Sequence, residues 1–384
     1  MQFEFATATE IVFGAGIAAG AGARIARFGT KALVVTGATP DRASGIAKSM
    51  TEAGVHHASY AVAHEPTLED ARRATALARD HGAELVVACG GGSAIDLGKA
   101  VAALLANPGD PLEYVEVVGR GRPIVNWSVP FVAVPTTAGT GAEVTKNAVL
   151  GAPDDAIKVS LRSPHMLARL ALVDPMLTVD LPPRVTIATG LDALTQLLEP
   201  FVSVKANPLT DAICLEALPR LTRALPRVVT DGSDVDARAD MAFASLCSGL
   251  ALANAGLGAV HGFAAAIGGR FQAPHGSVCA ALLPAATRIN IRALRARAAS
   301  SRALERFGVL ASVVTRQSQR TPEALADWLH ELTSNLRVPG LAAYGVSARD
   351  ADAIVAGAER ANSMRSNPLP LERNELEEIL AASL

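Results

Sequence analysis

The residues best suited to chemistry are Asp192 and Gln196, two polar residues four positions apart inside an apolar run. If residues 190–199 are helical, both side chains project from the same face, one turn apart. Their neighbours are mostly leucine and alanine, and a buried carboxylate without a partner is very costly. His261 and His275 supply two imidazoles further along the chain. One carboxylate, one amide oxygen and two imidazoles would form a four-ligand site for a divalent transition metal, although each residue taken singly could be a helix cap or an ordinary core residue.

Two loops could hold a phosphate-containing ligand. Residues 90–93 read Gly-Gly-Gly-Ser, directly after a predicted strand and before a predicted helix, so that backbone N–H groups can approach a pyrophosphate at the positive end of a helix. This is not the G-x-G-x-x-G pattern, and three glycines could also form only a tight turn. Residues 135–145 follow another predicted strand and carry four threonines and two glycines. Two such loops at the ends of two strands favour one dinucleotide lying across both.

The elements around these loops alternate between strand and helix. Buried apolar runs predict strands at residues 31–36, 84–89 and 131–134. Helices are predicted at residues 17–28, 42–53 and 67–79, the last opened by the capping-box sequence Thr67-Leu-Glu-Asp70. Alternation of this kind predicts a mainly parallel sheet covered by helices on both faces.

The second half of the chain has a different character. After Pro182 and Pro183 it is rich in Ala and Leu, with no strong strand signal, and helices are predicted at residues 321–332 and from 371 onward. Residues 241–269 contain no Asp, Glu, Lys or Arg, and we interpret them as two buried helices broken near residue 257 rather than as a membrane span. We therefore predict two domains, an α/β domain over residues 1–181 and an all-α domain over residues 182–384.

Composition excludes several classes of partner. The 384 residues carry a net charge of −2 with 4% aromatic residues, which gives no case for nucleic acid or an anionic membrane as a partner. The four cysteines form no C-x-x-C pair, which is typical of free thiols in a reducing compartment. The first residues lack a basic stretch followed by an apolar run, so no signal peptide is predicted. We expect a cytoplasmic protein with a small-molecule substrate.

Five motifs together are more specific than any one of them. They are Gly-Gly-Gly-Ser-x-x-Asp-x-x-Lys at residues 90–99, Pro-Thr-Thr-Ala-Gly-Thr-Gly-x-Glu-Val-Thr at 135–145, Val-Asp-Pro-x-Leu-Thr at 173–178, Gly-x-Asp-Ala-Leu-Thr at 190–195 and Pro-His-Gly at 274–276. In order and spacing, over essentially the whole chain, this set resembles the iron-containing alcohol dehydrogenase family.

The resemblance implies a fold and an activity. The fold is the dehydroquinate synthase-like one, with an α/β nucleotide-binding domain, an all-α domain and a metal in the cleft between them. The activity is hydride transfer between a small alcohol, or its aldehyde or ketone, and NAD or NADP, with the metal as Lewis acid. Fe²⁺ is the expected ion, with Zn²⁺ or Mn²⁺ as alternatives, and the expected assembly is a homodimer.

The resemblance also assigns residues. It implies metal ligands at Asp192, Gln196, His261 and His275, of which Asp192, His261 and His275 would take part in catalysis through the metal. The implied cofactor-binding residues are Gly37, Gly91, Gly92, Ser93, Asp96, Thr136, Thr137, Thr140, Thr145, Asn147 and Lys158.

The chain departs from the family at several of these places. Gln196 stands where the family has His, and an amide oxygen is usually a weaker donor than imidazole. Ala265 replaces a second His near the nicotinamide, which leaves the proton acceptor unassigned, and Glu65 replaces the usual Asn before Pro66. Gly37 stands in place of an acidic residue that would repel a 2′-phosphate, and Arg42 would reach such a phosphate if its loop folds back. We therefore predict that NADP(H) is tolerated beside NAD(H).

Three rival readings remain open. The first is a metal-independent reductase of a small oxo acid, similar to maleylacetate reductase; residues 267–271 and His64 favour it slightly, and the retained Asp192 argues against it. The second is a lyase on the dehydroquinate synthase fold, which the loop at residues 135–145 disfavours. The third is a scaffold without activity, which the retention of three of the four family ligands disfavours.

Overall fold

The computed structural model describes residues 2–152 and 157–384, which form two compact units. One unit consists of Phe5–Leu181 together with Asp231–Gly249. The other consists of Pro182–Thr230 and Leu250–Leu384, with residues 2–4. The chain passes between the units at residues 181 and 182, where the sequence analysis placed its domain boundary, but residues 231–249 return to the first unit.

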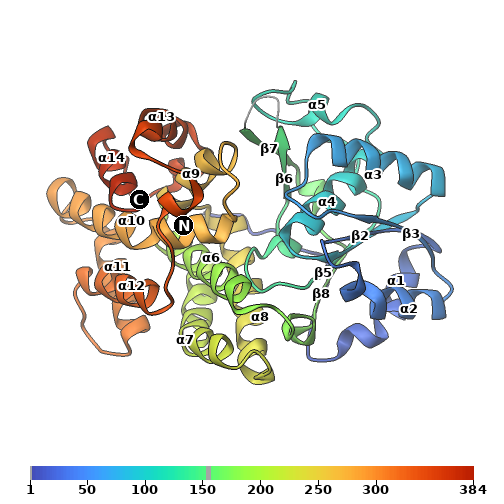
Figure 1. The fold of residues 1–384 in the computed structure, drawn as a ribbon, viewed down its shortest axis with the longest axis horizontal. Helices are drawn as coiled ribbons and strands as arrows, with labels where there is room; N and C mark the ends of the chain where they lie inside the picture. Colours follow the sequence, from blue (N-terminus) through green and yellow to red (C-terminus); the bar gives the residue numbers. More distant parts are fainter. Residues whose placement is uncertain (1, 153–156) are drawn as a thin grey trace. The chain divides into compact units, whose positions relative to one another are not determined.

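The first unit is built on a six-stranded parallel sheet (Figure 1). Its strands are β1 (Ile11–Phe13), β2 (Lys31–Thr36), β3 (His56–Ala61), β4 (Leu85–Gly90), β5 (Phe131–Pro135) and β8 (Leu170–Val173), in the order β1-β8-β5-β4-β2-β3. A separate antiparallel hairpin joins β6 (Asn147–Ala152) to β7 (Ile157–Arg162). The predictions of a mainly parallel sheet and of three of its strands are confirmed.

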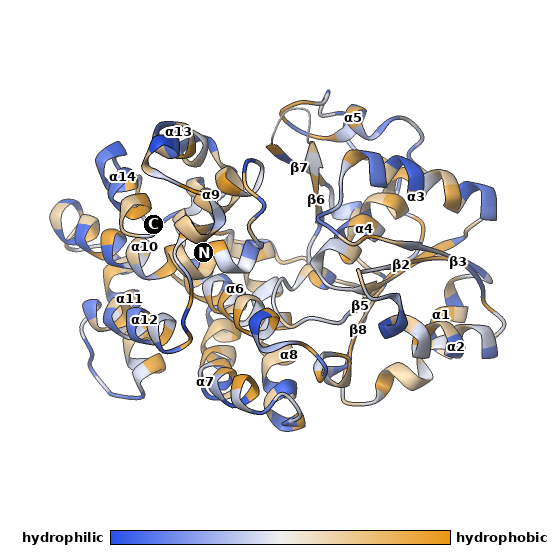
Figure 2. Ribbon diagram, in the orientation of Figure 1, coloured by the Kyte–Doolittle hydropathy of each residue, from blue (hydrophilic) through white to orange (hydrophobic). Residues whose placement is uncertain are grey.

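Helices cover both faces of this sheet. They are α1 (Ala21–Ile25), α2 (Ser44–Glu52), α3 (Leu68–His81) and α4 (Gly92–Ala106), and the short α5 (Pro111–Tyr114) follows them. Figure 1 shows α1 and α2 on one side of the sheet and α3 and α4 on the other. Ile46 and Met50 of α2 share a buried cluster with Val87 of β4, whereas Gly98 of α4 lies against Ala88, the next residue along that strand. Successive strand residues point to opposite faces, and every residue of β4 and β5 is buried, so both faces are covered at the centre of the sheet. The hydropathy colours of the strands can be followed in Figure 2.

The helix predicted at residues 17–28 is not continuous. It is divided into a 3₁₀ turn at Ile17–Gly20, the short α1, and a second 3₁₀ turn at Ala26–Phe28. The α-helical part packs closely on α2, because a Cβ on Gly22 would lie 1.9 Å from the Ser49 carbonyl oxygen. The predicted span is therefore right, but only its middle five residues are α-helical.

The capping box predicted at Thr67 and Asp70 is present. The Asp70 N–H donates to Thr67 Oγ1 at 3.1 Å, and the Thr67 N–H donates to Asp70 Oδ2 at 2.9 Å. Gly82 ends α3 in the left-handed conformation with a φ of 69°. Both ends of this helix therefore follow from local sequence.

The second unit is helical, and the structure describes no strand in it. Its helices are α6 (Pro183–Val202), α7 (Pro208–Thr230), α9 (Ala259–Gly268), α10 (His275–Arg297), α11 (Arg302–Thr315), α12 (Glu323–Asn335), α13 (Ala351–Arg360) and α14 (Arg373–Ala381), while α8 (Val235–Ala255) begins in the first unit and ends in the second. The predicted break between α8 and α9 is present. Among the described helices, none alone is long and apolar enough to cross a membrane, and one bent pair, α8 with α9, has sufficient length and apolar composition.

Residues 231–249 belong with the α/β unit because of contacts that composition does not reveal. The buried Arg238 donates from its guanidinium to the carbonyl oxygens of Val179 and Leu181, at 3.3 and 3.4 Å. Gly249 and Gly141 are so close that a Cβ on Gly141 would lie 2.3 Å from the Gly249 Cα. These contacts fix the start of α8 to the α/β unit.

A buried lysine ties the threonine-rich loop to α4. Lys99 Nζ donates to the Ala142 carbonyl at 2.9 Å, to Thr145 Oγ1 at 2.8 Å and to the Asn147 carbonyl, and it pairs with Asp96 Oδ1 at 3.0 Å. The Lys99 side chain is 1% exposed. Its loss leaves a carboxylate and several acceptors without their donor.

We expect Lys99→Met to lower the free energy of unfolding by about 2–4 kcal/mol, because breaking a buried hydrogen-bonded pair strands the remaining groups. Urea denaturation followed by circular dichroism measures the change. The matched control is Lys48→Met. The Lys48 side chain is 78% exposed, and its Nζ lies 3.9 Å from Glu52 Oε1, so its loss removes only a surface ion pair. Equal stability of the two variants would contradict this structural role for Lys99.

Candidate functional site

The two loops predicted to bind a dinucleotide, and the predicted cofactor residue Gly37, follow the carboxyl ends of neighbouring strands of the parallel sheet. Gly37 follows β2, Gly91 follows β4 and Thr136 follows β5, and these strands are neighbours in the sheet. A Cβ on Gly90 would lie 3.1 Å from the Gly37 amide nitrogen, and one on Gly91 would lie 3.3 Å from Thr137 Cγ2. In the sheet, β3 lies on one side of β2 and β4 lies on the other, so the strand order reverses between β2 and β4. The α/β proteins bind ligands at the carboxyl ends of the strands next to such a reversal.

The start of α4 is shaped for close backbone approach. Gly91 is the N-cap residue of α4, and no side chain caps this end of the helix. A Cβ on Gly92 would lie 2.8 Å from Thr140 Cγ2, so the threonine-rich loop packs directly on the glycine loop. Uncapped N–H groups at the positive end of a 15-residue helix are suited to a phosphate.

Several predicted cofactor residues hold the loops in place. Asp96 Oδ2 accepts from the Val149 N–H at 3.1 Å, and Thr145 Oγ1 accepts from Lys99. Lys158 Nζ pairs with Glu65 Oε2 at 2.6 Å. The structure thus gives Asp96, Thr145 and Lys158 contacts within the α/β unit, and direct contact of Ser93, Asn147 and these residues with a dinucleotide stays a prediction.

Arg42, which was expected to reach a 2′-phosphate, is hydrogen-bonded to backbone carbonyls. Its guanidinium donates to the carbonyl oxygens of Leu177 and Asp180, at 3.3 and 2.8 Å. A contact between Arg42 and a phosphate would require these hydrogen bonds to break. Gly37, in contrast, has open space where a Cβ would stand. The argument for NADP(H) tolerance therefore depends on Gly37 and not on Arg42.

In the helical unit, three of the predicted metal ligands converge. Asp192 Oδ1 on α6 lies 3.5 Å from His261 Nε2 on α9 and 3.6 Å from His275 Nε2 at the start of α10. Cys279, one turn further along α10, places its Sγ 3.9 Å from His261 Nε2 and 3.7 Å from His275 Nε2. The four ligand atoms of these residues lie within 4.8 Å of one another. We call Asp192, His261, His275 and Cys279 the ligand cluster.

Gln196 borders the cluster as a hydrogen-bond donor. Its Nε2 donates to Asp192 Oδ2 at 2.9 Å, which leaves Oδ1 as the oxygen that faces the two histidines. Asp192 is 1% exposed, and Oδ1 has no hydrogen-bond partner among the described residues. The predicted role of Gln196 as a ligand stays a prediction, and its placement here is that of a neighbour that orients Asp192.

Glu199 orients one of the histidines. Its Oε2 accepts from His261 Nδ1 at 2.7 Å, and its Oε1 accepts from the Val260 N–H at 2.7 Å. A carboxylate can only accept, so Nδ1 of His261 carries a proton and Nε2 can offer its lone pair to the cluster. Partners of this kind fix the tautomer and the ring orientation of metal-binding histidines.

The charges in the cluster support one another. Burial opposes ionisation of Asp192, but the charges of His275 and His261 outweigh it and lower the pKa of the carboxyl. Burial lowers the pKa of His261, yet the charges of Cys279 and Glu199 outweigh burial and raise it. The Cys279 charge likewise raises the pKa of His275, and although burial raises the pKa of the Cys279 thiol, the two histidines lower it overall. Buried anions and imidazoles that stabilise one another can exchange protons for a divalent cation.

A glycine brings the two ligand-bearing helices together. A Cβ on Gly276 would lie 2.3 Å from the Ala188 carbonyl oxygen of α6 and 3.4 Å from Asp192 Cβ. Only glycine fits this contact, and it places His275 next to Asp192. The Pro-His-Gly motif therefore combines a ligand with the close approach that the ligand needs.

Replacing Glu199 with Gln is expected to weaken binding of a divalent ion by about 10–100-fold, the range found when outer-shell partners of metal ligands are changed. The neutral amide holds the His261 ring less firmly and makes it less basic. Isothermal titration of the chelated protein with Zn²⁺ measures the change. Glu375→Gln is the control, because Glu375 is buried in the same unit but pairs with Arg297 at 2.6 Å. Unchanged Zn²⁺ affinity in Glu199→Gln would remove Glu199 from the site.

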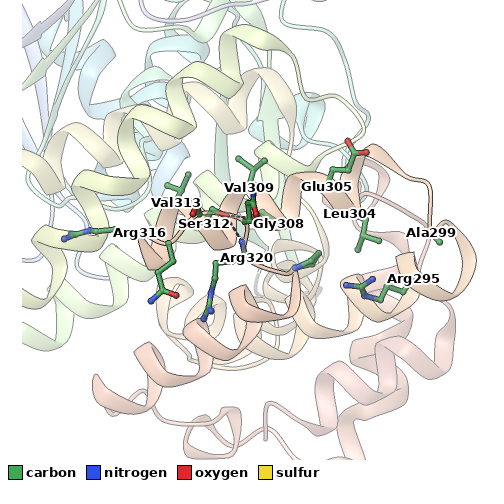
Figure 3. Close-up of a pocket in the computed structure, with 14 residues that line it drawn as sticks. Arg295, Ala299, Leu304, Glu305, Gly308, Val309, Ser312, Val313, Arg316 and Arg320 are labelled. Atoms are coloured by element: carbon green, nitrogen blue, oxygen red, sulfur yellow. Dashed lines mark hydrogen bonds between the residues drawn. The ribbon is translucent and has the colours of Figure 1, made fainter.

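A surface groove of about 730 Å³ lies apart from these residues (Figure 3). It runs along α11, past Leu304, Gly308 and Ser312, and is bordered by Arg316 and Arg320. Another of its basic residues, Arg295, is paired with Glu323 at 2.9 Å. None of the predicted site residues lines this groove, so it gives no support to the chemistry described above.

The sequence analysis missed Cys279 and Glu199. Cys279 follows His275 by four residues, the spacing that had singled out Asp192 and Gln196, so its signal was present. Glu199 lies 62 residues from His261, and only the fold brings the two together. Ala265, on α9 four residues after His261, is exposed. Because the residue is alanine, the second imidazole of the family's motif is absent from this position.

Comparison with known proteins gives one consistent family. The model described as "Iron-containing alcohol dehydrogenase" matches residues 8–175, and the model of the C-terminal part of the Fe-containing alcohol dehydrogenase family matches residues 186–384. The chain is 31% identical to NAD-dependent methanol dehydrogenase of Bacillus methanolicus over 379 residues, 97% of each protein. It is 43% identical to long-chain-alcohol dehydrogenase 1 of Geobacillus thermodenitrificans over 228 residues, 59% of this chain and 57% of that protein. The crystal structure of a 1,3-propanediol oxidoreductase superposes with a TM-score of 0.92 at 31% identity, covering 100% of both chains.

Proposed function

Because this chain belongs to the iron-containing alcohol dehydrogenase family, whose members are oxidoreductases, we propose that it interconverts a small alcohol and its aldehyde or ketone with NAD or NADP and a divalent metal. The observation that carries the proposal is the ligand cluster, which unites Asp192, His261 and His275 from three helices. The similarity to an enzyme named NAD-dependent methanol dehydrogenase supports the nicotinamide part of the proposal.

The cluster fits a divalent transition metal. Asp192 Oδ1 is buried without a hydrogen-bond partner among the described residues, and two imidazole nitrogens face it. A carboxylate oxygen with imidazole nitrogens suits Fe²⁺ and Zn²⁺. When bound, such an ion supplies a Lewis acid for the substrate oxygen. Glu199 and Gln196 hold His261 and Asp192 in the orientation that this role requires.

The glycine and threonine loops fit a dinucleotide. Gly91 and Gly92 leave backbone uncovered at the positive end of α4, and Thr137 and Thr140 lie against them with hydroxyl groups. The nicotinamide, when bound, supplies the hydride acceptor or donor. The two sets of residues belong to different units of the chain, and the proposed reaction uses residues of both.

A cofactor-consumption screen tests the proposal. Protein freed of metal by chelation is supplied separately with Fe²⁺, Zn²⁺ and Mn²⁺ and offered alcohols with NAD or NADP, and aldehydes, ketones and oxo acids with the reduced cofactors. We expect turnover of an alcohol–carbonyl pair that depends on the added ion. Reduction of oxo acids alone, at full rate without metal, would support instead the metal-independent reductase considered from the sequence.

The relatives are named for different alcohols, so we do not assign a chain length to the substrate of this protein. The cytoplasmic location and the homodimer stay predictions.

Replacing Gly37 with Asp is expected to reduce binding of NADPH about 10-fold or more, with a smaller effect on NADH, because a carboxylate at the end of β2 repels a 2′-phosphate. A Cβ at Gly37 meets no atom within 4 Å, so the substitution is compatible with the fold. Fluorescence titration with both reduced cofactors measures the ratio of their dissociation constants. Gly37→Asn adds a side chain of the same size without charge and is the control. An unchanged ratio in Gly37→Asp would place the adenosine ribose elsewhere.

A further inference from the structure

We propose that Cys279, through its thiolate, is the fourth protein ligand of the divalent ion, and that Gln196 orients Asp192 without binding the ion. The inference rests on the metal site of the proposed function and adds to it a ligand that differs in chemistry. It follows from four observations on the ligand cluster.

The first observation is the spacing of the ligand atoms. A tetrahedral ion with bonds of about 2.0 Å to oxygen or nitrogen and about 2.3 Å to sulfur separates an oxygen–nitrogen pair by about 3.3 Å and a nitrogen–sulfur pair by about 3.5 Å. Asp192 Oδ1 lies 3.5 and 3.6 Å from the two imidazole Nε2 atoms, and Cys279 Sγ lies 3.7 and 3.9 Å from the same atoms. These distances exceed the ideal values by only a few tenths of an ångström. The sulfur therefore lies close enough to bind an ion that the other three residues hold.

The second observation is the position of Cys279 on α10. It follows His275 by one turn, so both side chains project from the same face of the helix. Cys279 is 0% exposed, and the close contact of Gly276 with α6 holds this face of α10 against Asp192. The thiol thus points into the cluster in a fixed place, and it needs no rearrangement to bind an ion.

The third observation is the orientation of Gln196. Its Nε2 donates to Asp192 Oδ2, which ties the amide to the oxygen that faces away from the histidines. If the amide turned over, its carbonyl oxygen would face a carboxylate oxygen, and two acceptors without a proton between them repel each other. Binding of the ion through the amide oxygen would therefore cost the Gln196–Asp192 hydrogen bond, whereas binding through Cys279 keeps it.

The fourth observation is the unsatisfied oxygen at the centre. Asp192 Oδ1 is buried and has no hydrogen-bond partner among the described residues, although imidazole nitrogens surround it. A buried acceptor without a partner is rare in native proteins and points to an absent ion or water. The atoms around it form a set of one oxygen, two nitrogens and one sulfur. A thiolate in the set favours Zn²⁺ and Co²⁺ over Mn²⁺ and Mg²⁺, which prefer oxygen ligands.

The test is a cobalt titration of the full-length, chelated protein under anaerobic conditions, followed by absorption spectroscopy. Thiolate bound to Co²⁺ gives an intense sulfur-to-cobalt charge-transfer band in the near ultraviolet, and oxygen or nitrogen ligands alone do not. We expect this band in the wild type, rising to a plateau at one equivalent of Co²⁺. The wild-type spectrum needs no variant, so it is informative even if a substitution disturbs folding.

Three variants separate the candidate ligands. Cys279→Ser should still bind one Co²⁺, without the band and about 10-fold or more weaker, since even outer-shell changes cost this much. Gln196→Ala should keep the band. Cys89→Ala is the control for loss of a buried thiol outside the cluster and should behave as the wild type.

The possible failures differ. A wild type that binds one Co²⁺ without the band overturns the assignment of Cys279 and leaves the metal site of the proposed function intact. The same holds if Gln196→Ala loses the ion while Cys279→Ser retains full affinity. A wild type that binds no Co²⁺ and no Zn²⁺ overturns both the ligand assignment and the metal site.

Discussion

Asp192→Ala is expected to abolish binding of the divalent ion and to lower kcat/KM for the alcohol by about 10³-fold or more, because a Lewis acid contributes several kcal/mol to transition-state stabilisation. Asp192 contributes the central oxygen of the cluster, within 3.6 Å of both imidazole nitrogens. Without Asp192, the ligand cluster has no carboxylate to bind the ion. Elemental analysis after dialysis against Zn²⁺ measures the stoichiometry, and steady-state kinetics measures the activity.

The control for this prediction is Asp327→Ala. Asp327 lies on α12 of the same unit, is 68% exposed and pairs with Arg288 at 3.0 Å, so its loss should change neither metal content nor turnover. Asp192→Asn keeps the size of the side chain and the amide oxygen but loses the charge, and we expect metal affinity between those of the wild type and Asp192→Ala. Full turnover by an Asp192→Ala protein that holds no metal would refute a role for the cluster in catalysis.

The second large effect is expected at the glycine loop. Gly92→Val should weaken binding of NADH by about 10–100-fold, equivalent to about 1–3 kcal/mol of steric cost, since a side chain occupies the space through which the backbone approaches the pyrophosphate. Isothermal titration with NADH measures it. The substitution also disturbs the packing of the glycine loop on the threonine-rich loop, because a Cβ at Gly92 would lie 2.8 Å from Thr140 Cγ2.

A double variant separates these two effects. Gly92→Ala in a Thr140→Ser background removes the methyl group that lies 2.8 Å from the new Cβ and keeps the hydroxyl oxygen, which lies 3.2 Å from it, so the closest contact between the loops is relieved. We expect NADH binding to stay weak in the double variant and to be near normal in Thr140→Ser alone. Normal binding by the double variant would show that glycine serves the packing of the two loops and not the cofactor.

The parts of the fold that were predicted correctly depend on local sequence. Runs such as residues 31–36 are apolar and rich in β-branched residues, a composition that favours a strand. The capping box at Thr67 and the left-handed Gly82 likewise act within one helix. The glycine loop was predicted from its place between a strand and a helix. The trio of Asp192, His261 and His275 was predicted because polar residues of these types stand in apolar runs, and the structure brings their side chains together.

The parts that were not predicted depend on contacts between distant segments. The close packing of Gly22 on Ser49 joins segments 27 residues apart, and the hydrogen bond from Arg238 to the Val179 carbonyl ties residues 231–249 to the α/β unit. Glu199 reaches His261 only through the packing of α6 on the start of α9. Arg42 was assigned to a phosphate because its partners, two backbone carbonyls more than 130 residues away, cannot be read from local sequence. Cys279 is different, since its four-residue spacing from His275 was visible in the sequence, but the cysteines were interpreted only as free thiols.

The most direct measurement of the central claim couples turnover to metal content. Chelated wild-type protein is titrated with Zn²⁺ or Fe²⁺, and formation of reduced nicotinamide from the best alcohol of the screen is recorded at each addition. The account predicts no turnover at the start, a linear rise and a break at one equivalent of metal per chain, with no rise in Asp192→Ala. Full turnover by protein that retains no metal, unchanged by any addition, would contradict it.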